Sequence, residues 1–236
     1  MGAVTWIARR ELSNYFGSLT AYIVVILFLL MTGGMFWLDF FQGFPELSMR
    51  RLFADAPMFL AFFAPAITMG LVAEEKRSGT LELLMTMPVS DTQVVLGKFF
   101  AAVTLLLVTF ALTLPYALSI STMGDLDWGP VIGGYAGLVL LGSTYVAVGI
   151  MVSSWTKDQI VAILLGFFFC FTLFIMDRMF SNQSGVVAQT FEYLSSNYHF
   201  QNIARGVIEV SDVVYYLSVT TICLTAARVT LAARRW

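Results

Sequence analysis

The largest group of charged residues in this chain lies within residues 72–89, which read V-A-E-E-K-R-S-G-T-L-E-L-L-M-T-M-P-V. It begins with four consecutive charged residues: Glu74, Glu75, Lys76 and Arg77. Gly79 can adopt the left-handed conformation that ends a helix, and Thr80 and Glu82 suit the first turn of the next one. Long uncharged apolar runs surround this charged segment, which is a place where a membrane protein can receive a force or signal. We therefore predict a structured intracellular connector between two membrane spans.

The second half of this connector has its own helix signals. Pro88 interrupts the chain, and Ser90 with Gln93 forms a capping-box pattern for a helix that continues through Lys98. Residues 80–87 form a short amphipathic piece, which could dock into a partner or lie against the membrane. Its apolar residues are Leu81, Leu83, Leu84, Met85 and Met87.

Motifs for catalysis are absent from the sequence. The chain has no G-x-x-x-x-G-K-[ST], no H-E-x-x-H and no G-x-S-x-G, and His199 is its only histidine. A lone histidine without partner ligands makes neither a metal site nor a catalytic triad, so we interpret His199 as a structural or interfacial residue. We assign no catalytic residue, metal site or cofactor to this chain. Any ATP-driven process would need an ATPase in another chain.

Composition places these residues in a membrane protein. Hydrophobic residues make up 58% of the chain, charged residues 12%, and mean hydropathy is +0.82. A spanning helix needs about 20 apolar residues. Continuous apolar runs argue against a transmembrane β-barrel, whose strands alternate in polarity. The prediction is an all-α, polytopic helical bundle in one domain, 1–236, with spans at about 19–39, 56–74, 98–120, 130–152, 159–177 and 213–232.

The distribution of Lys and Arg predicts the orientation of the bundle. With the N-terminus inside, nine of the 13 basic residues fall on the cytoplasmic side and four, at 50, 51, 178 and 205, fall outside. Both termini are then cytoplasmic, 74–97 is a cytoplasmic coupling loop, and 178–212 is an outer segment. The expected location is the plasma (inner) membrane. A net charge of −2 and the lack of basic-aromatic motifs argue against a nucleic-acid partner.

The first residues have a mixed polar and apolar pattern. Residues 3–17 predict a helix that lies on the inner leaflet, in contact with membrane lipid, before the first span. Its charged residues are Arg9, Arg10 and Glu11.

The spans hold features of helix packing rather than of ion transport. Ionisable residues lie near predicted span ends, which argues against a proton relay. Gly133 and Gly137 form a G-x-x-x-G pattern, suited either to a contact within the subunit or to a dimer seam. Pro65 and Pro115 each remove a backbone donor, and we expect both to kink their helices.

Two parts of the chain resemble the permeases of type-2 ABC exporters. Their intracellular loop commonly reads E-x-[KR]-x-x-G-T-x-[ED]-x-L-x-x-x-P, which here is matched by Glu74, Lys76, Gly79, Thr80, Glu82, Leu84 and Pro88. Near the C-terminus, Leu194-Ser195, Tyr198-His199-Phe200, Arg205-Gly206-Val207-Ile208 and Asp212-Val213-Val214-Tyr215-Tyr216 resemble the permeases of gliding-motility and nitrous-oxide-reductase maturation systems. Those often carry Pro where this chain has Ser196.

The resemblance implies a set of partners and roles. Two permeases pair, either two copies or this chain with a related one, and each docks a cytosolic ABC ATPase that binds ATP and Mg²⁺. An extracytoplasmic accessory protein is a further implied partner, and the outer segment would fold back into the membrane. The implied ATPase-coupling residues are Glu74, Glu75, Lys76, Arg77, Gly79, Thr80, Glu82, Leu84 and Pro88, with Arg9, Arg10 and Glu11 completing the dock.

The function implied by the resemblance is that of a membrane-spanning permease subunit of an ATP-driven exporter. An alternative is a membrane scaffold or assembly factor of an ABC-type complex that does not itself move a solute. An intramembrane enzyme is a third class, but it lacks any catalytic constellation. The sequence does not separate the first two, because fold and coupling loop would look the same in both.

Overall fold

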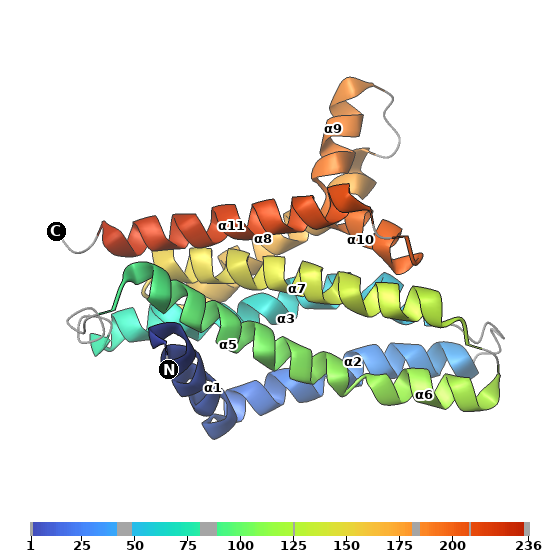
Figure 1. Ribbon diagram of the computed structural model, residues 1–236, viewed down its shortest axis with the longest axis horizontal. Helices are drawn as coiled ribbons and strands as arrows, with labels where there is room; N and C mark the ends of the chain where they lie inside the picture. Colours follow the sequence, from blue (N-terminus) through green and yellow to red (C-terminus); the bar gives the residue numbers. More distant parts are fainter. Residues whose placement is uncertain are drawn as a thin grey trace.

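The computed structural model describes residues 2–41, 49–80, 89–124, 126–180, 185–207 and 209–233. Of the predicted coupling residues, Glu82, Leu84 and Pro88 lie outside these ranges. Within them all regular structure is helical, as predicted (Figure 1). The helices are α1 (Ala3–Gly17), α2 (Leu19–Phe41), α3 (Arg50–Arg77), α5 (Asp91–Ala111), α6 (Leu114–Met123), α7 (Trp128–Trp155), α8 (Gln159–Phe180), α9 (Val186–Leu194), α10 (Ser196–Ala204) and α11 (Val210–Ala232).

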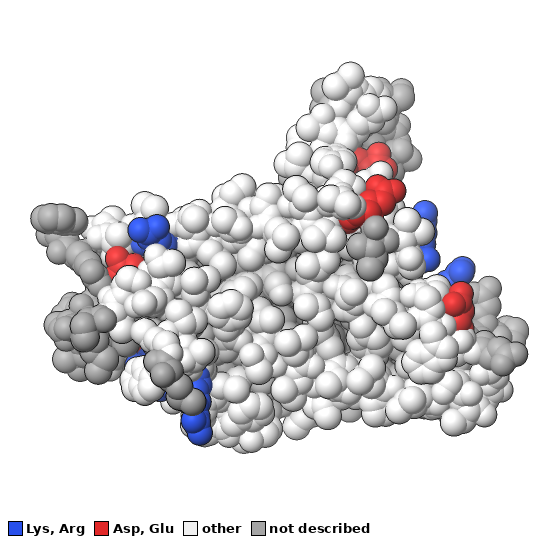
Figure 2. Space-filling model, in the orientation of Figure 1, with Lys and Arg blue, Asp and Glu red and all other residues white. Residues whose placement is uncertain are grey.

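Six helical stretches of the described chain are long and apolar enough to cross a membrane. They comprise Leu19–Leu38, Arg50–Arg77, Asp91–Met123, Trp128–Trp155, Gln159–Met179 and Val210–Ala232. On the face shown in Figure 2, charged side chains gather toward the two ends of the bundle and leave a broad uncharged belt between them. That distribution suits a bundle whose middle lies in hydrocarbon.

The two ends of the bundle hold different elements. One end, called here the terminal end, holds the end of α11, α1, the end of α3 and the start of α5, and α1 crosses the bundle there (Figure 1). The opposite end holds α6, α9 and α10, with α9 projecting from the side of the bundle. Residues 156–158 connect α7 to α8 at the terminal end.

Helices α3 and α7 form the centre of the bundle. In the apolar window of each, 72% of the residues are buried, compared with 22% for α8 and α11. Close packing of α7 depends on glycine: a Cβ at Gly134 would lie 2.4 Å from the Phe53 ring of α3. At Gly133 it would lie 2.5 Å from the carbonyl oxygen of Ile203 in α10. The glycines of α7 therefore make contacts within the subunit, the first of the two alternatives predicted for Gly133 and Gly137.

The third span consists of two helices. α5 ends at Ala111 and α6 begins at Leu114, with Pro115 in its first turn. Proline has no N–H and is accommodated at this position of a helix, where the N–H would lack an intrahelical partner. The predicted distortion at Pro115 is therefore a break between two helices. Pro65, in contrast, lies inside the uninterrupted helix α3.

Candidate functional site

Helix α1 is seated on α5 at the terminal end by an apolar contact. Ile7 is fully buried, and a Cβ at Gly97 of α5 would lie 2.7 Å from its side chain. Val94, one turn before Gly97, packs against Ile7 as well. Only a glycine lets the two helices approach this closely, so Gly97 fixes where α1 crosses the bundle.

Four charged side chains meet beside this contact and are called here the charge cluster: Arg10, Glu11, Glu75 and Lys98. Lys98 Nζ lies 3.1 Å from Glu11 Oε1 and 2.8 Å from Glu75 Oε2. Arg10 Nη2 lies 2.6 Å from Glu11 Oε1 and 2.8 Å from Glu75 Oε1. Each cation thus contacts both carboxylates, and the cluster joins α1, α3 and α5.

Because the charge cluster is largely buried, its stability depends on all four of its side chains. The Lys98 side chain is 0% exposed, and an ammonium group without a partner at such a place would be very costly. Burial by itself would raise the pKa of Glu11, but Lys98 and Arg10 outweigh that effect and hold the pKa of this carboxyl below its ordinary value. Glu11 is therefore a carboxylate near neutral pH, and the cluster has no net charge.

The last turns of α3 are tied to the end of α7. Lys76 donates to the carbonyl oxygen of Ser154, and the Ser153 hydroxyl donates to the carbonyl oxygen of Met69 at 2.9 Å. The same hydroxyl accepts from the backbone N–H of Ala73 at 3.1 Å. Met69 and Ala73 are an i, i+4 pair, whose groups bond each other in a regular helix. The Ser153 hydroxyl therefore bonds to both groups of one i, i+4 pair of α3, a position at which a polar side chain can weaken the helix ladder.

Gly79 ends α3 as the sequence predicts. Its φ of +74° is in the left-handed region, directly after the Ser78 cap, and the Ser78 hydroxyl contacts that of Thr80 at 2.9 Å. The predicted capping box of Ser90 and Gln93 is also present at the start of α5. The chain therefore leaves the bundle after α3 and re-enters it at α5 through defined caps.

The predicted site residues that the structure describes separate into two sets, apart from Glu74, which contacts Gln159 of α8. Arg10, Glu11 and Glu75 meet in the charge cluster, and Lys76 binds α7. Arg9, Arg77, Gly79 and Thr80 are exposed and do not join the cluster. This exposed set is open to a partner, whereas the buried set holds α1 and α3 in place.

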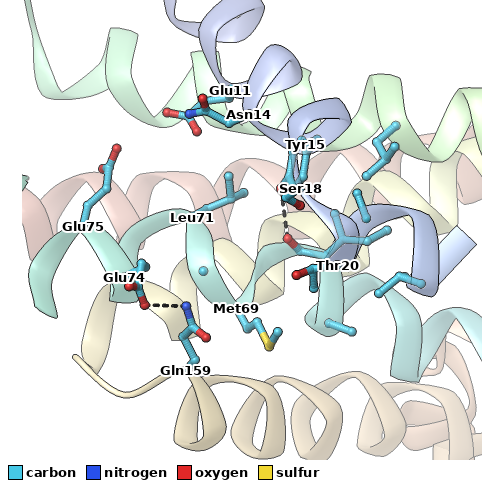
Figure 3. Close-up of a pocket in the computed structure, with 16 residues that line it drawn as sticks. Glu11, Asn14, Tyr15, Ser18, Thr20, Met69, Leu71, Glu74, Glu75 and Gln159 are labelled. Atoms are coloured by element: carbon cyan, nitrogen blue, oxygen red, sulfur yellow. Dashed lines mark hydrogen bonds between the residues drawn. The ribbon is translucent and has the colours of Figure 1, made fainter. Parts of the chain in front are cut away.

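Three further polar residues contribute to the terminal end and were not predicted as site residues: Lys98, Ser153 and Gln159. Gln159, the first residue of α8, donates to the Glu74 carboxylate (Figure 3). A lysine about one third of the way along an apolar helix is a signal that could have identified Lys98, because such a group is rarely tolerated without partners. Ser153 and Gln159 have no comparable signal, since isolated Ser and Gln are common at helix ends.

A pocket of about 320 Å³ lies next to the charge cluster, between α1, α2 and α3 (Figure 3). Its lining includes Glu11 and Tyr15 of α1 and Glu74 and Glu75 of α3. The Tyr15 hydroxyl donates to the carbonyl oxygen of Ile67 at 2.9 Å, which fixes the end of α1 to the middle of α3.

The opposite end has its own buried polar contacts. His199 of α10 lies 2.6 Å from Asp212 of α11 through Nδ1 and 2.9 Å from the carbonyl oxygen of Tyr193 through Nε2. Asp177 of α8 accepts from Ser195 at 3.1 Å and from Asn197 at 2.8 Å. His199 is thus a buried structural residue, one of the two roles predicted for it. Among the described residues no group of three or more His, Cys, Asp and Glu side chains could hold a metal ion.

A comparison with known families gives a match over most of the chain. The sequence model described as ABC-2 family transporter protein matches residues 52–229, from the start of α3 to near the end of α11. A comparison with curated proteins gave no match.

Proposed function

The chain belongs to the ABC-2 family of transporter proteins, and from this premise we propose that it is the permease subunit of an ATP-driven exporter whose ATPase is a separate cytosolic chain. The ATPase docks at the terminal end, on the segment after α3 and on the exposed side of α1. In this proposal the terminal end faces the cytoplasm. A closer relationship to the permeases of gliding-motility and nitrous-oxide-reductase maturation systems is part of the same proposal. The motifs near the C-terminus support it.

The observation that carries the proposal is the charge cluster. It joins the two elements that the sequence assigns to the dock, α1 and the end of α3, to the start of α5. A displacement of either docking element is therefore transmitted to two spanning helices at once. The chain itself gives a second route for the displacement, because the proposed dock lies in the segment that connects α3 to α5.

Movement of α3 has a defined place to begin. The hydroxyl of Ser153 bonds to the backbone groups of Met69 and Ala73, about one to two turns before the end of the helix. We propose that the end of α3 bends there when the ATPases close on ATP and Mg²⁺, while α7 stays fixed by its glycine contacts. Two permeases, identical or related, would place such elements on both sides of a translocation path.

The test is isolation of the native complex in mild detergent, followed by identification of the chains that co-purify. Wild type is compared with a Glu74→Ala/Glu75→Ala double variant and with Gly79→Pro. Proline fixes φ at about −65° and so excludes the +74° of Gly79. We expect a cytosolic ATPase with the wild type, and its loss or the loss of substrate-stimulated ATP hydrolysis in both variants.

Two controls accompany these variants, and the thermal stability of each purified variant separates a lost dock from a lost fold, because Glu75 also pairs with the buried Lys98. Gly79→Asn keeps a residue that tolerates the left-handed conformation and should retain the ATPase. Glu192→Ala removes an exposed carboxylate of α9 at the opposite end and should behave as wild type. If no ATPase accompanies the wild type, the docking proposal is wrong. If an ATPase binds but responds only to a protein client, the chain is an assembly factor rather than an exporter subunit.

A further inference from the structure

The pocket beside α1 has a polar rim and an apolar interior (Figure 3). Along α3, Ile67 and Leu71 lie toward the middle of the bundle, and Glu74 and Glu75 lie in the last turn. Along α2, Thr20 precedes Val24 in the same inward direction. Polarity therefore falls with depth, from the level of α1 toward the uncharged belt.

The charge of the rim has one sign. The lining contains three carboxylates, from Glu11, Glu74 and Glu75, and no lysine or arginine. Lys98 and Arg10 neutralise Glu11 and Glu75 from outside the lining. Glu74 receives a hydrogen bond from the neutral Gln159 amide instead, and it is half-buried. The rim therefore keeps a negative charge at Glu74.

The backbone strengthens this negative potential. Glu74 lies in the last turn of α3, at the negative end of the helix dipole, and its carbonyl oxygen accepts from the backbone N–H and the hydroxyl of Ser78. Hydrogen-bond acceptors in the rim include the Glu74 carboxylate and the side-chain oxygens of Asn14 and Ser18. Such a rim favours a cation that can donate several hydrogen bonds and disfavours an anion.

We propose that this pocket binds an amphiphilic amine, with a primary or secondary ammonium group at Glu74 and a slim apolar chain between α2 and α3. The chain would lie against Val24, Ile67 and Leu105, which have no polar side-chain atoms. A volume of about 320 Å³ is at the lower end of the roughly 300–1,000 Å³ typical of small-ligand sites. It admits one short chain rather than a whole diacyl lipid.

The source of the amine is either a free amphiphile or the ammonium head of a bilayer lipid with part of one chain. Both carry the same chemistry into the pocket. The inference goes beyond the proposed exporter activity, since binding at this site requires neither an ATPase nor transport.

The test measures binding of octylammonium to the purified permease in phosphatidylcholine nanodiscs, without ATPase. Octanol, octyl sulfate and octyltrimethylammonium serve as matched probes. We expect saturable binding of octylammonium that is tighter than that of the other three. Equal binding of octanol would overturn the proposal, because it would show that the rim charge has no part in recognition.

Two variants locate the site. Glu74→Gln removes the charge and keeps an amide of similar size, and it should weaken octylammonium binding by about threefold or more. Gly70→Leu should abolish binding by filling the pocket, while its Cβ meets only ordinary contact, 3.5 Å from Gln159 Nε2. Glu192→Gln, a control at the opposite end, should bind as wild type. Unchanged affinity in both pocket variants would overturn the proposal.

A last arm separates the two sources. Phosphatidylethanolamine replaces part of the phosphatidylcholine in the nanodiscs. If it competes with octylammonium in wild type and not in Gly70→Leu, a bilayer lipid is an occupant of the pocket. If it does not compete while octylammonium still binds, the pocket is specific for free amphiphilic amines.

Discussion

The two ends of the bundle both bury ionised or ionisable groups, but they connect them differently. At the terminal end, Lys98 pairs with Glu11, 87 residues away, and Arg10 pairs with Glu75, 65 residues away. At the opposite end, His199 and Asp212 are 13 residues apart. The first arrangement therefore holds distant elements together, whereas the second fixes one local segment.

The charge cluster is also more exposed than the pair of His199 and Asp212. The Arg10 and Glu75 side chains are 34% and 17% exposed, so the charge cluster reaches the surface of the bundle. The His199 and Asp212 side chains are 0% and 2% exposed. A partner that binds α1 can thus compete for members of the cluster, but it cannot reach the histidine pair without opening the fold. This difference suits a movable terminal end and a fixed opposite end.

Replacing Lys98 gives the strongest test of that comparison. Lys98→Ala leaves Glu11 and Glu75 with only Arg10, and breaking a buried pair in this way costs about 3–5 kcal/mol. We expect a large fall in the thermal stability of the purified permease and early protease cleavage around α1. In the double variant Glu11→Gln/Lys98→Met the unpaired charge is reduced and much of the stability should return. Equal stability of Lys98→Ala and wild type would show that the cluster does not hold α1.

Replacing Asp212 tests the fixed end and should have a smaller effect. Asp212→Leu leaves Nδ1 of the buried His199 without its acceptor, which costs about 1–3 kcal/mol. Amide hydrogen exchange should increase in α10 and the start of α11 and stay unchanged in α1. Asp212→Asn keeps a hydrogen-bonding side chain and should lose less stability than Asp212→Leu. Increased exchange at the terminal end would mean that the two ends are coupled through the bundle.

Much of this arrangement could be predicted from sequence, because it depends on local signals. Apolar runs predicted the helices of the bundle, Gly79 its left-handed cap, and Ser90 with Gln93 the capping box of α5. The coupling role of the connector stays a prediction, and so do the bounds of the membrane spans and the re-entrant nature of the outer segment.

The contacts that organise the site could not be predicted from sequence. Glu74 and Gln159 are 85 residues apart, and Ser153 lies 80 residues from Ala73. Such pairs depend on how α3, α7 and α8 pack, and a single sequence contains no periodicity that links them. Lys98 is intermediate, since its cost in an apolar helix indicates a partner without identifying Glu11 or Glu75 as that partner.

Acidification tests the terminal end as well, with a smaller expected effect on stability. The pKa of Glu11 is lower in the folded protein than its ordinary value of about 4.3–4.5, so folding is favoured by its ionised form. That stabilisation is fully present above about pH 4.5 and is lost as the pH falls through the lower folded-state pKa. Attachment of α1 should therefore weaken in this acid range, as measured by the fluorescence of Trp6. Glu11→Gln should remove this part of the pH dependence, and an unchanged transition in that variant would assign it to other carboxyl groups.

The smallest expected effect concerns the hydrogen bonds of Ser153 to α3. Ser153→Ala removes a hydroxyl that serves the groups of Met69 and Ala73, but these two groups can then bond each other, so the loss of stability should be within about 0.5–1.5 kcal/mol. Without the competing hydroxyl, the end of α3 should be stiffer, while the charge cluster would still hold α1 in place. We therefore expect an intact complex with ATPase whose substrate-stimulated hydrolysis is reduced, and Ser153→Thr, which keeps the hydroxyl, should retain more of it. If substrate stimulates ATP hydrolysis in the Ser153→Ala complex as strongly as in wild type, α3 moves as a rigid rod. The mobility of the terminal end then depends on the charge cluster alone.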